Sequence, residues 1–278
     1  MQTSFWPGFF IILAAVGACK AAVVEPPSAS VKISILSGRP VVSQVFLNGQ
    51  GPYRFLLDTG AQTNQVDAAL ARKLALTATF QVELETASGV THARGGRVNQ
   101  VSLGSAAASN QEFLFTNLDG LHTLSPDLRG ILGQEFLAHF DYTLDFHDHR
   151  LTFGSAPGAG AHMPVRLVDG RMALSTSLGE LVLDSGTDSL ILFRSSAHPV
   201  TRQILAASGK TTTVSMERMS ELCIGGRPYR VAKAAVEPQP GAHEAGLLPA
   251  SLFRALFISN SEGYVVVDPG QNAHPGMD

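Results

Sequence analysis

Short apolar runs, many with polar residues at alternate positions, recur along the chain and are separated by Gly, Pro, Asn and Asp. Such alternation between turn residues is typical of β-strands. The pattern predicts strands over residues 41–47, 113–115, 142–146, 151–153 and 264–267. Helical spacing is sparse and predicts helices only over 67–76, with Asp67 as the N-cap, and over 249–257, where a proline opens the first turn. We therefore expect an all-β chain with few short helices.

Two of the apolar runs end in the same short motif. Residues 55–61 read Phe-Leu-Leu-Asp-Thr-Gly-Ala, and residues 181–187 read Leu-Val-Leu-Asp-Ser-Gly-Thr. Each run places a carboxylate, Asp58 or Asp184, where a buried strand is expected to turn. Two carboxylates brought into contact there cannot both ionise easily, so one keeps a proton. Such a pair can take a proton from a water molecule and give one to a carbonyl oxygen, which is general acid–base hydrolysis.

The residues beside each carboxylate suit this chemistry. The hydroxyls of Thr59 and Ser185 are expected to orient the Asp pair through hydrogen bonds, while Gly60 and Gly186 allow a tight turn and a close approach of the two loops. An Asp-Thr/Ser-Gly triplet is also an ordinary turn signal, and that interpretation explains a single copy equally well. The second copy, with the same apolar lead-in, favours a shared site.

The duplication extends beyond this motif. Four landmarks occur in the same order in both halves, at 36–39, 47–49, 101–104 and 130–133 in the first and at 168–171, 177–179, 222–225 and 246–249 in the second. A repeated order of this kind predicts two related lobes. We expect the first lobe over 28–156 and the second over 157–270, following a leader and short tether over 1–27.

These residues resemble those of the aspartic peptidases, both the single-chain pepsin-like enzymes and the half-sized retropepsin-like domains that dimerise. In that family an apolar-apolar-Asp-Thr/Ser-Gly loop supplies each catalytic Asp, and a later apolar-apolar-Gly strand passes beneath the loop. Residues 131–133, Ile-Leu-Gly, look like this second strand. Residues 247–249 take its place in the second half, with Pro249 where the family usually has Gly. The resemblance covers roughly 31–268, and over 51–61 its detail is closest to bacterial retropepsin-like domains.

The resemblance implies a bilobal acid-protease fold, in which two β-barrel-like lobes flank a central cleft. It implies an aspartic endopeptidase acting on peptide or protein substrates, with Asp58 and Asp184 as the catalytic pair and with no metal and no cofactor. Both catalytic loops lie in one chain, so a monomer is expected. Pepsin-like enzymes carry a Tyr on the hairpin flap that closes over substrate, whereas no Tyr occurs between Asp58 and Ile131 here.

The flap is instead expected in residues 86–97, whose small and Gly residues suit a mobile hairpin that excludes water on closing. Ser88, Gly89 and Val90 are the predicted substrate contacts. An ordinary exposed loop is the alternative for this segment. A shorter counterpart is predicted at residues 208–212 of the second lobe.

Two other functions stay open on the sequence alone. Pro249 and the unconventional flap would suit a non-catalytic cell-envelope binding protein that keeps the fold with a degenerate Asp pair. Alternatively, two copies of the first lobe could pair through Asp58, as in a homodimeric retropepsin-like peptidase, with the second lobe accessory. Only the single-chain peptidase predicts a monomer that is inactivated by substitution of either Asp.

Charge and metal-ligand patterns argue against other classes. The net charge is −3 and 15% of residues are charged, so there is no basic surface for nucleic acid or for an anionic membrane. Asp and His residues over 141–149 could hold a metal ion, but a charged hairpin turn between two strands explains the same residues. Cys223 stands alone in an apolar segment, where we expect a packed core position and no disulfide.

The N-terminus predicts export. Apolar residues 9–18 have the length of a signal-peptide core and are short for a membrane span. Residues 16–19 resemble a bacterial lipoprotein box, in which Cys19 would be lipidated and become the mature N-terminus. Residues 1–18 contain no Lys or Arg, which is unusual for a signal peptide, and an uncleaved anchor reaching Val24 is the alternative. Each reading places the protein in the periplasm or cell envelope, with a membrane tether where the N-terminus is lipidated or uncleaved.

Overall fold

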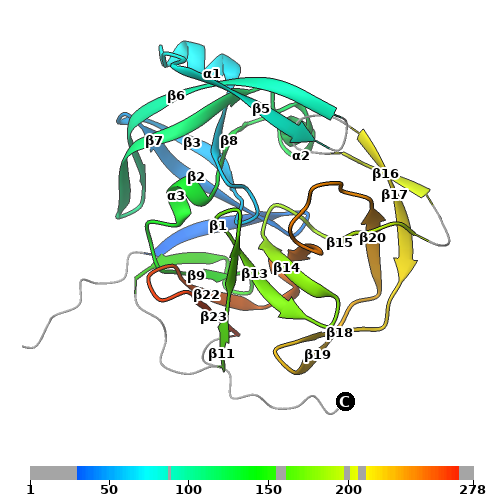
Figure 1. The fold of residues 1–278 in the computed structure, drawn as a ribbon. Coiled ribbons are helices and arrows are strands. Elements are labelled where there is room, and N and C mark those ends of the chain that lie inside the picture. Colours follow the sequence, from blue (N-terminus) through cyan, green and yellow to red (C-terminus); the bar gives the residue numbers. More distant parts are fainter. Residues whose placement is uncertain (1–29, 87–88, 155–160, 197–200, 206–210, 269–278) are drawn as a thin grey trace, which may run out of the picture.

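Strands dominate the structure, a computed structural model that describes residues 30–86, 89–154, 161–196, 201–205 and 211–268. The strands form two sheets, one of 13 strands and one of 10 strands. Figure 1 shows the first half of the chain, in blue to green, beside the second half, in light green to orange. The all-β, two-lobed architecture expected from the sequence is confirmed.

The larger sheet holds the first lobe and the strands that join the two lobes. Its strands are β1 (Ser30–Leu36), β2 (Arg39–Leu47), β3 (Gln50–Leu57), β4 (Asn64–Asp67), β5 (Phe80–Thr86), β6 (Gly89–Leu103), β7 (Ala106–Thr116), β8 (Leu128–Leu132), β9 (Tyr142–Asp145), β10 (Arg150–Phe153), β11 (Ala161–Pro164), β22 (Ala255–Ser259) and β23 (Tyr264–Val267). The sheet order is β11-β23-β22-β9-β10-β1-β2-β3-β8-β4-β7-β6-β5.

The smaller sheet belongs to the second lobe. Its strands are β12 (Arg166–Val168), β13 (Arg171–Thr176), β14 (Gly179–Asp184), β15 (Leu190–Phe193), β16 (Thr201–Leu205), β17 (Thr211–Arg218), β18 (Glu221–Ile224), β19 (Arg227–Arg230), β20 (Lys233–Glu237) and β21 (Gly246–Pro249). The sheet order is β16-β17-β20-β15-β21-β14-β13-β18-β19, with β12 beside β13.

The two lobes share one strand topology, as the repeated landmarks predict. In the first lobe β3 pairs antiparallel with β2 and parallel with β8, and β4 lies between β8 and a parallel β7. In the second lobe β14 pairs antiparallel with β13 and parallel with β21, and β15 lies between β21 and a parallel β20. The strand that precedes each Asp motif therefore occupies the same place in its own sheet.

One predicted helix is confirmed and the other is wrong. α1 (Ala68–Lys73) begins where expected, because the Asp67 carboxylate accepts hydrogen bonds from the N–H groups of Ala69 and Leu70. Over 249–257 only a short 3-10 helix forms, η1 (Ala250–Leu252), and the rest is the buried strand β22. A short run of apolar residues does not distinguish a helix from a buried strand. Pairing of β22 with β9 and β23 decides the outcome.

Two further helices, α2 (Asp119–Leu124) and α3 (Gln134–Leu137), were not predicted. Both are short, so an apolar periodicity hardly develops in them. Cys223 is half-buried rather than a core residue, because the alternation of β18 buries Leu222 and Ile224 instead. The charged turn between β9 and β10 forms as expected, and the described residues contain no cluster of His, Cys, Asp and Glu that could hold a metal ion.

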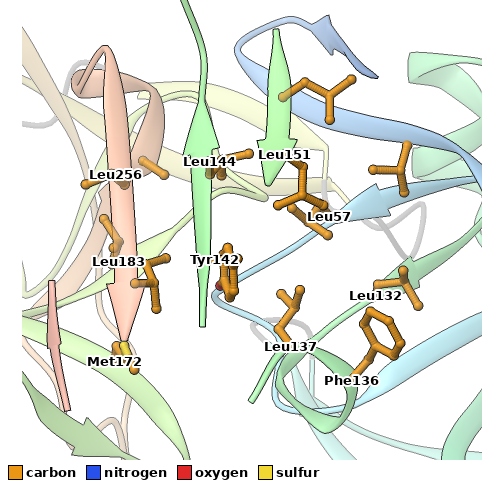
Figure 2. Close-up of a cluster of buried hydrophobic side chains, with 14 of the residues drawn as sticks. Leu57, Leu132, Phe136, Leu137, Tyr142, Leu144, Leu151, Met172, Leu183 and Leu256 are labelled. Carbon is orange, nitrogen blue, oxygen red and sulfur yellow. The ribbon is translucent and has the colours of Figure 1, made fainter. Parts of the chain in front are cut away.

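A common core joins the lobes. Strand β22, from the second half of the chain, pairs antiparallel with β9, from the first half, so both halves contribute strands to the larger sheet. The main cluster of buried apolar residues includes Leu57 of the first lobe, Leu183 of the second and Tyr142 of β9, which Figure 2 shows close to one another. Leu57 and Leu183 each directly precede a motif Asp, so both motifs rest on this core. In the part of the chain that the structure covers, no helix is long and apolar enough to cross a membrane.

Candidate active site

Asp58 and Asp184 lie at equivalent points of the two lobes. Asp58 directly follows β3, and its N–H donates to the carbonyl of Leu132 on the parallel strand β8 over 2.9 Å. Asp184 ends β14 and pairs with Pro249 on the parallel strand β21. The strands are buried and apolar up to this point, so each carboxylate stands where the chain leaves the core. Both loops face the lobe boundary, where they meet.

Four hydrogen bonds between buried groups connect the loops across that boundary. The Thr59 hydroxyl donates to the carbonyl of Leu183 over 2.7 Å and accepts from the N–H of Ser185 over 2.9 Å. The Ser185 hydroxyl donates to the carbonyl of Leu57 over 2.6 Å and accepts from the N–H of Thr59 over 3.0 Å. We call this set the interlobe lock. In these bonds both hydroxyls pair with the backbone of the opposite lobe rather than with the carboxylates, so they orient the Asp pair through the loops.

Each carboxylate packs against the glycine of the opposite loop. A Cβ atom built on Gly60 would lie 2.4 Å from the carboxyl carbon of Asp184, and one built on Gly186 would lie 2.4 Å from an oxygen of Asp58. Real Cβ atoms do not approach other atoms so closely. Only glycine at these two positions lets the carboxyl groups reach each other, and they are hydrogen-bonded to one another.

The two carboxyl groups have different electrostatic surroundings. Burial raises the pKa of Asp58 above its ordinary value. The N–H groups of Gly60 and Ala61, at 2.9 and 3.0 Å from its Oδ1, the hydrogen bond with Asp184 and the positive charge of Arg39 offset this rise in part. Burial together with the charge of Asp58 raises the pKa of Asp184 well above its ordinary value. Asp184 is 7% exposed, and Asp58 is more exposed. The shared proton therefore favours Asp184, with Asp58 ionised, and the pair titrates as a unit.

Arg39 is a site residue that sequence reasoning missed, although it belongs to a repeated landmark. Its Nε donates to the carbonyl of Gly186 over 2.7 Å, and its Nη1 lies 3.1 Å from a carboxylate oxygen of Asp188. The counterpart in the second half, Arg171, stays within its own lobe, where it pairs with the buried Glu244 over 2.9 Å. The Gly-Arg pair that recurs before each Asp motif could have pointed to Arg39. Its binding partner, the carbonyl of Gly186, lies far away in the sequence and could not be found from that pair alone.

The hydrogen bond that supports the first Asp loop from beneath has no counterpart in the second lobe, because both its donor and its acceptor are replaced there. In the first lobe the N–H of Gly133 donates to the side-chain oxygen of Asn64, the first residue of β4, over 3.0 Å. In the second lobe Pro249 has no N–H to donate. The residue that begins β15 is Leu190, whose side chain has no hydrogen-bond acceptor. Donor and acceptor are thus both absent, and the substitution of Gly by Pro leaves no unsatisfied group at this point.

The predicted flap is a hairpin. β5 pairs antiparallel with β6 from Phe80 opposite Gly95 to Thr86 opposite Gly89. Gly89 and Val90 begin β6, whereas Ser88 lies outside the described residues. In Figure 1 this hairpin runs across the top of the molecule, on the same side as the β16–β17 hairpin of the second lobe. Contact of these residues with substrate stays a prediction.

The remaining predicted positions fall outside the described part of the chain. Residues 208–210, in the expected second flap, lie in the undescribed stretch between β16 and β17. Cys19 and the leader segment belong to residues 1–29, which the structure does not describe. Export and lipidation therefore stay predictions.

Known families agree with the geometry of the first lobe. Residues 43–136 match a family model described as aspartyl protease. The resemblance to the aspartic peptidases is confirmed. The matched segment includes Asp58, Thr59 and Gly60, together with the supporting strand β8, and it ends within α3. It does not extend to the second lobe, whose relation to the first rests on the repeated motif and topology.

Several solved structures are similar to part of the chain. One of them is a retropepsin-like aspartic protease from Rickettsia conorii, with 21% sequence identity and a TM-score of 0.34, and the match covers 45% of this chain and 89% of that one. A search of curated proteins gave no match.

Proposed function

We propose that this protein is an aspartic endopeptidase in which Asp58 and Asp184, from two lobes of one chain, activate a water molecule and hydrolyse peptide bonds. The observation that carries the proposal is the mutual contact of the two carboxyl groups, each against the glycine of the opposite loop. The aspartyl protease match over residues 43–136 supports the reaction class.

The surroundings of the two carboxyl groups suggest their roles. Asp58 is the carboxylate that takes a proton from the water as the water oxygen bonds to the peptide carbonyl carbon. Asp184 is the acid that gives its proton to the carbonyl oxygen, so that a neutral tetrahedral diol forms without a covalent enzyme intermediate. In the second step Asp58 passes its proton to the peptide nitrogen, the C–N bond breaks, and Asp184 recovers a proton from a diol hydroxyl. Both groups then return to their starting states, and no cofactor is required.

The interlobe lock supports the single-chain reaction over the homodimeric alternative. Thr59 and Ser185 are buried, and their hydroxyls find partners only in the opposite half of the same chain. If two first lobes paired with each other, Ser185 and its hydrogen bonds to Leu57 and Thr59 would have no role in the pairing. We propose a monomer.

The alternative of a non-catalytic binding protein was motivated in part by Pro249. It is disfavoured because the side chain of Leu190 offers no acceptor for the N–H that Pro249 lacks, so no hydrogen bond is left unpaired there. The loop around Asp184 is supported instead by Arg39, which donates to the carbonyl of Gly186.

The substrate proposed is an extended segment of a peptide or protein. The β5–β6 hairpin would supply backbone hydrogen bonds to such a segment, and we propose Ser88, Gly89 and Val90 as the residues that contact it. We further propose that the enzyme acts in the periplasm or cell envelope after export, with Cys19 as a lipid anchor. These proposals come from the sequence of the leader and the hairpin.

Cleavage of a mixed peptide library between acidic and neutral pH tests the proposal. Asp58→Asn and Asp184→Asn are both expected to abolish cleavage while remaining folded. The matched control is Asp148→Asn, since Asp148 is an exposed carboxylate in the turn between β9 and β10. Full activity in either site variant would contradict the shared dyad, and absence of cleavage by the folded wild type would favour a binding function.

A further inference from the structure

The buried side chain of Gln134 contacts the loop that holds Asp58. Gln134 begins α3, directly after the supporting strand β8, and is 7% exposed. Its Nε2 donates to the carbonyl of Thr59 over 2.7 Å, and its backbone N–H donates to the carbonyl of Ala61 over 2.9 Å. Both bonds hold carbonyl groups of the loop that turns around Asp58.

One of these bonds acts on a peptide unit that also touches the carboxylate. The carbonyl of Thr59 and the N–H of Gly60 belong to the same peptide group, which is planar and rigid. The N–H of Gly60 donates to Oδ1 of Asp58 over 2.9 Å. Gln134 therefore binds the carbonyl side of the Thr59–Gly60 peptide group, and Asp58 binds its N–H side. A rotation of this peptide group that breaks the bond to Gln134 also distorts the bond to Asp58.

We propose that Gln134 is a positioning residue, which fixes the Thr59–Gly60 peptide so that its N–H stabilises the ionised form of Asp58. The proposal rests on the proposed role of Asp58 as the base. A carboxylate that loses an N–H partner becomes a weaker acid, so loss of the Gln134 amide is expected to raise the pKa of Asp58.

The second lobe lacks this device. Ala250, which follows Pro249 as Gln134 follows Gly133, has no side-chain amide that could bind the loop. The loop around Asp184 is held instead from the other lobe, by Arg39 at the carbonyl of Gly186. This difference fits the assigned roles, because the carboxyl group that stays protonated has less need of a fixed N–H donor.

The test compares Gln134→Met, which keeps the size of the side chain but removes the donor, with Gln111→Met. Gln111 is the other buried glutamine among the described residues. Its amide contacts the carbonyl of Ser109 and the ring of His139 and accepts from the side-chain amide of Asn64 over 3.5 Å, so these bonds do not reach the loop that holds Asp58. The first measurement is the pH titration of the Asp58 carboxyl carbon by NMR in the full chain, with the signal assigned by its loss in Asp58→Asn. The second is kcat and KM on a cleaved peptide across pH.

We expect the Asp58 titration to move to higher pH in Gln134→Met and to stay at its wild-type position in Gln111→Met. We also expect kcat to fall by roughly tenfold or more in Gln134→Met, with KM changed by less than about twofold. If Gln134→Met does not fold, Gln134→Asn keeps a buried amide that is one methylene shorter and should shift the titration in the same direction.

An unchanged titration in a folded Gln134 variant, or an equal shift in Gln111→Met, would overturn the proposal. The NMR comparison does not depend on turnover. If the wild type cleaves no peptide, the proposed peptidase function fails, while the titration still decides whether Gln134 positions Asp58.

Discussion

Gly60 of the first lobe lies so close to Asp184 of the second that a single added carbon would fall 2.4 Å from the carboxyl carbon. The reciprocal contact joins Gly186 to Asp58. Each glycine thus sets the separation of the two carboxyl groups. Glycine is therefore needed at these two positions because a side chain would collide with the carboxyl group of the opposite lobe, in addition to the demands of the turn in which each glycine lies.

Gly60→Ala is therefore expected to push Asp184 away from Asp58 and to lower kcat/KM by roughly 100-fold, since displacements of about 1 Å have effects of this size. The matched control is Gly263→Ala, because a Cβ atom at Gly263 meets nothing within 4 Å. That control has a positive φ of 74° and should lose some stability but keep its activity. Steady-state kinetics of the two folded variants would decide, and equal kcat/KM values would refute the steric argument.

Removal of the Thr59 hydroxyl should destabilise the whole molecule, because the lock joins both lobes. Thr59→Ala leaves the carbonyl of Leu183 and the N–H of Ser185 without their buried partner, at a cost of about 1–3 kcal/mol for each unsatisfied group. Thr59→Ser keeps the hydroxyl and should retain most of the stability. Urea unfolding measures the difference. A Thr59→Ala variant as stable as Thr59→Ser would show that the lock contributes nothing.

The raised pKa of Asp184 makes wild-type stability depend on pH. Because its pKa is higher in the folded than in the unfolded chain, the group favours folding while it is protonated, below the unfolded pKa of about 4. This contribution is lost as the pH rises through the folded pKa. Asp184→Asn mimics the protonated group at every pH. It should be more stable than the wild type near neutral pH, with the difference shrinking toward pH 4.

Urea unfolding of the wild type and Asp184→Asn at several pH values checks this prediction. Asp148→Asn controls for the general loss of one negative charge, because Asp148 is an exposed residue. A stability difference that grows as the pH falls would contradict the sign of the shift.

Arg39→Met should move the acid limb of the activity profile to higher pH. Arg39 lowers the pKa of Asp58 through its positive charge, so its removal raises the pH below which the base is protonated. The same change removes the bond to the carbonyl of Gly186. Arg54→Met is the control, since Arg54 pairs with the exposed Asp127. Profiles of kcat/KM against pH that coincide for both variants would argue against a role of Arg39 in the site.

Several elements were predictable because their causes are local. The capped start of α1 depends on Asp67 and the residues that directly follow it. Alternating apolar residues identified β2, β9, β10 and β23, and the two Asp motifs followed from adjacent residues. The repeat then related the halves, because equivalent landmarks occupy equivalent strands in both sheets.

Other features depended on contacts between residues far apart in sequence. The apolar segment 255–259 became a strand because β9 and β23 offered edges to pair with. The hydrogen bonds from Gln134 to the carbonyl of Thr59 and from Arg39 to the carbonyl of Gly186 also join residues far apart in the sequence, so local patterns did not predict them.

The sequence by itself determined which two carboxylates stand at the ends of buried strands, because apolar lead-in and turn residues are neighbours in the chain. Only the tertiary structure decided which of them keeps the proton. That choice depends on burial and on hydrogen-bond donors that distant segments place around each loop.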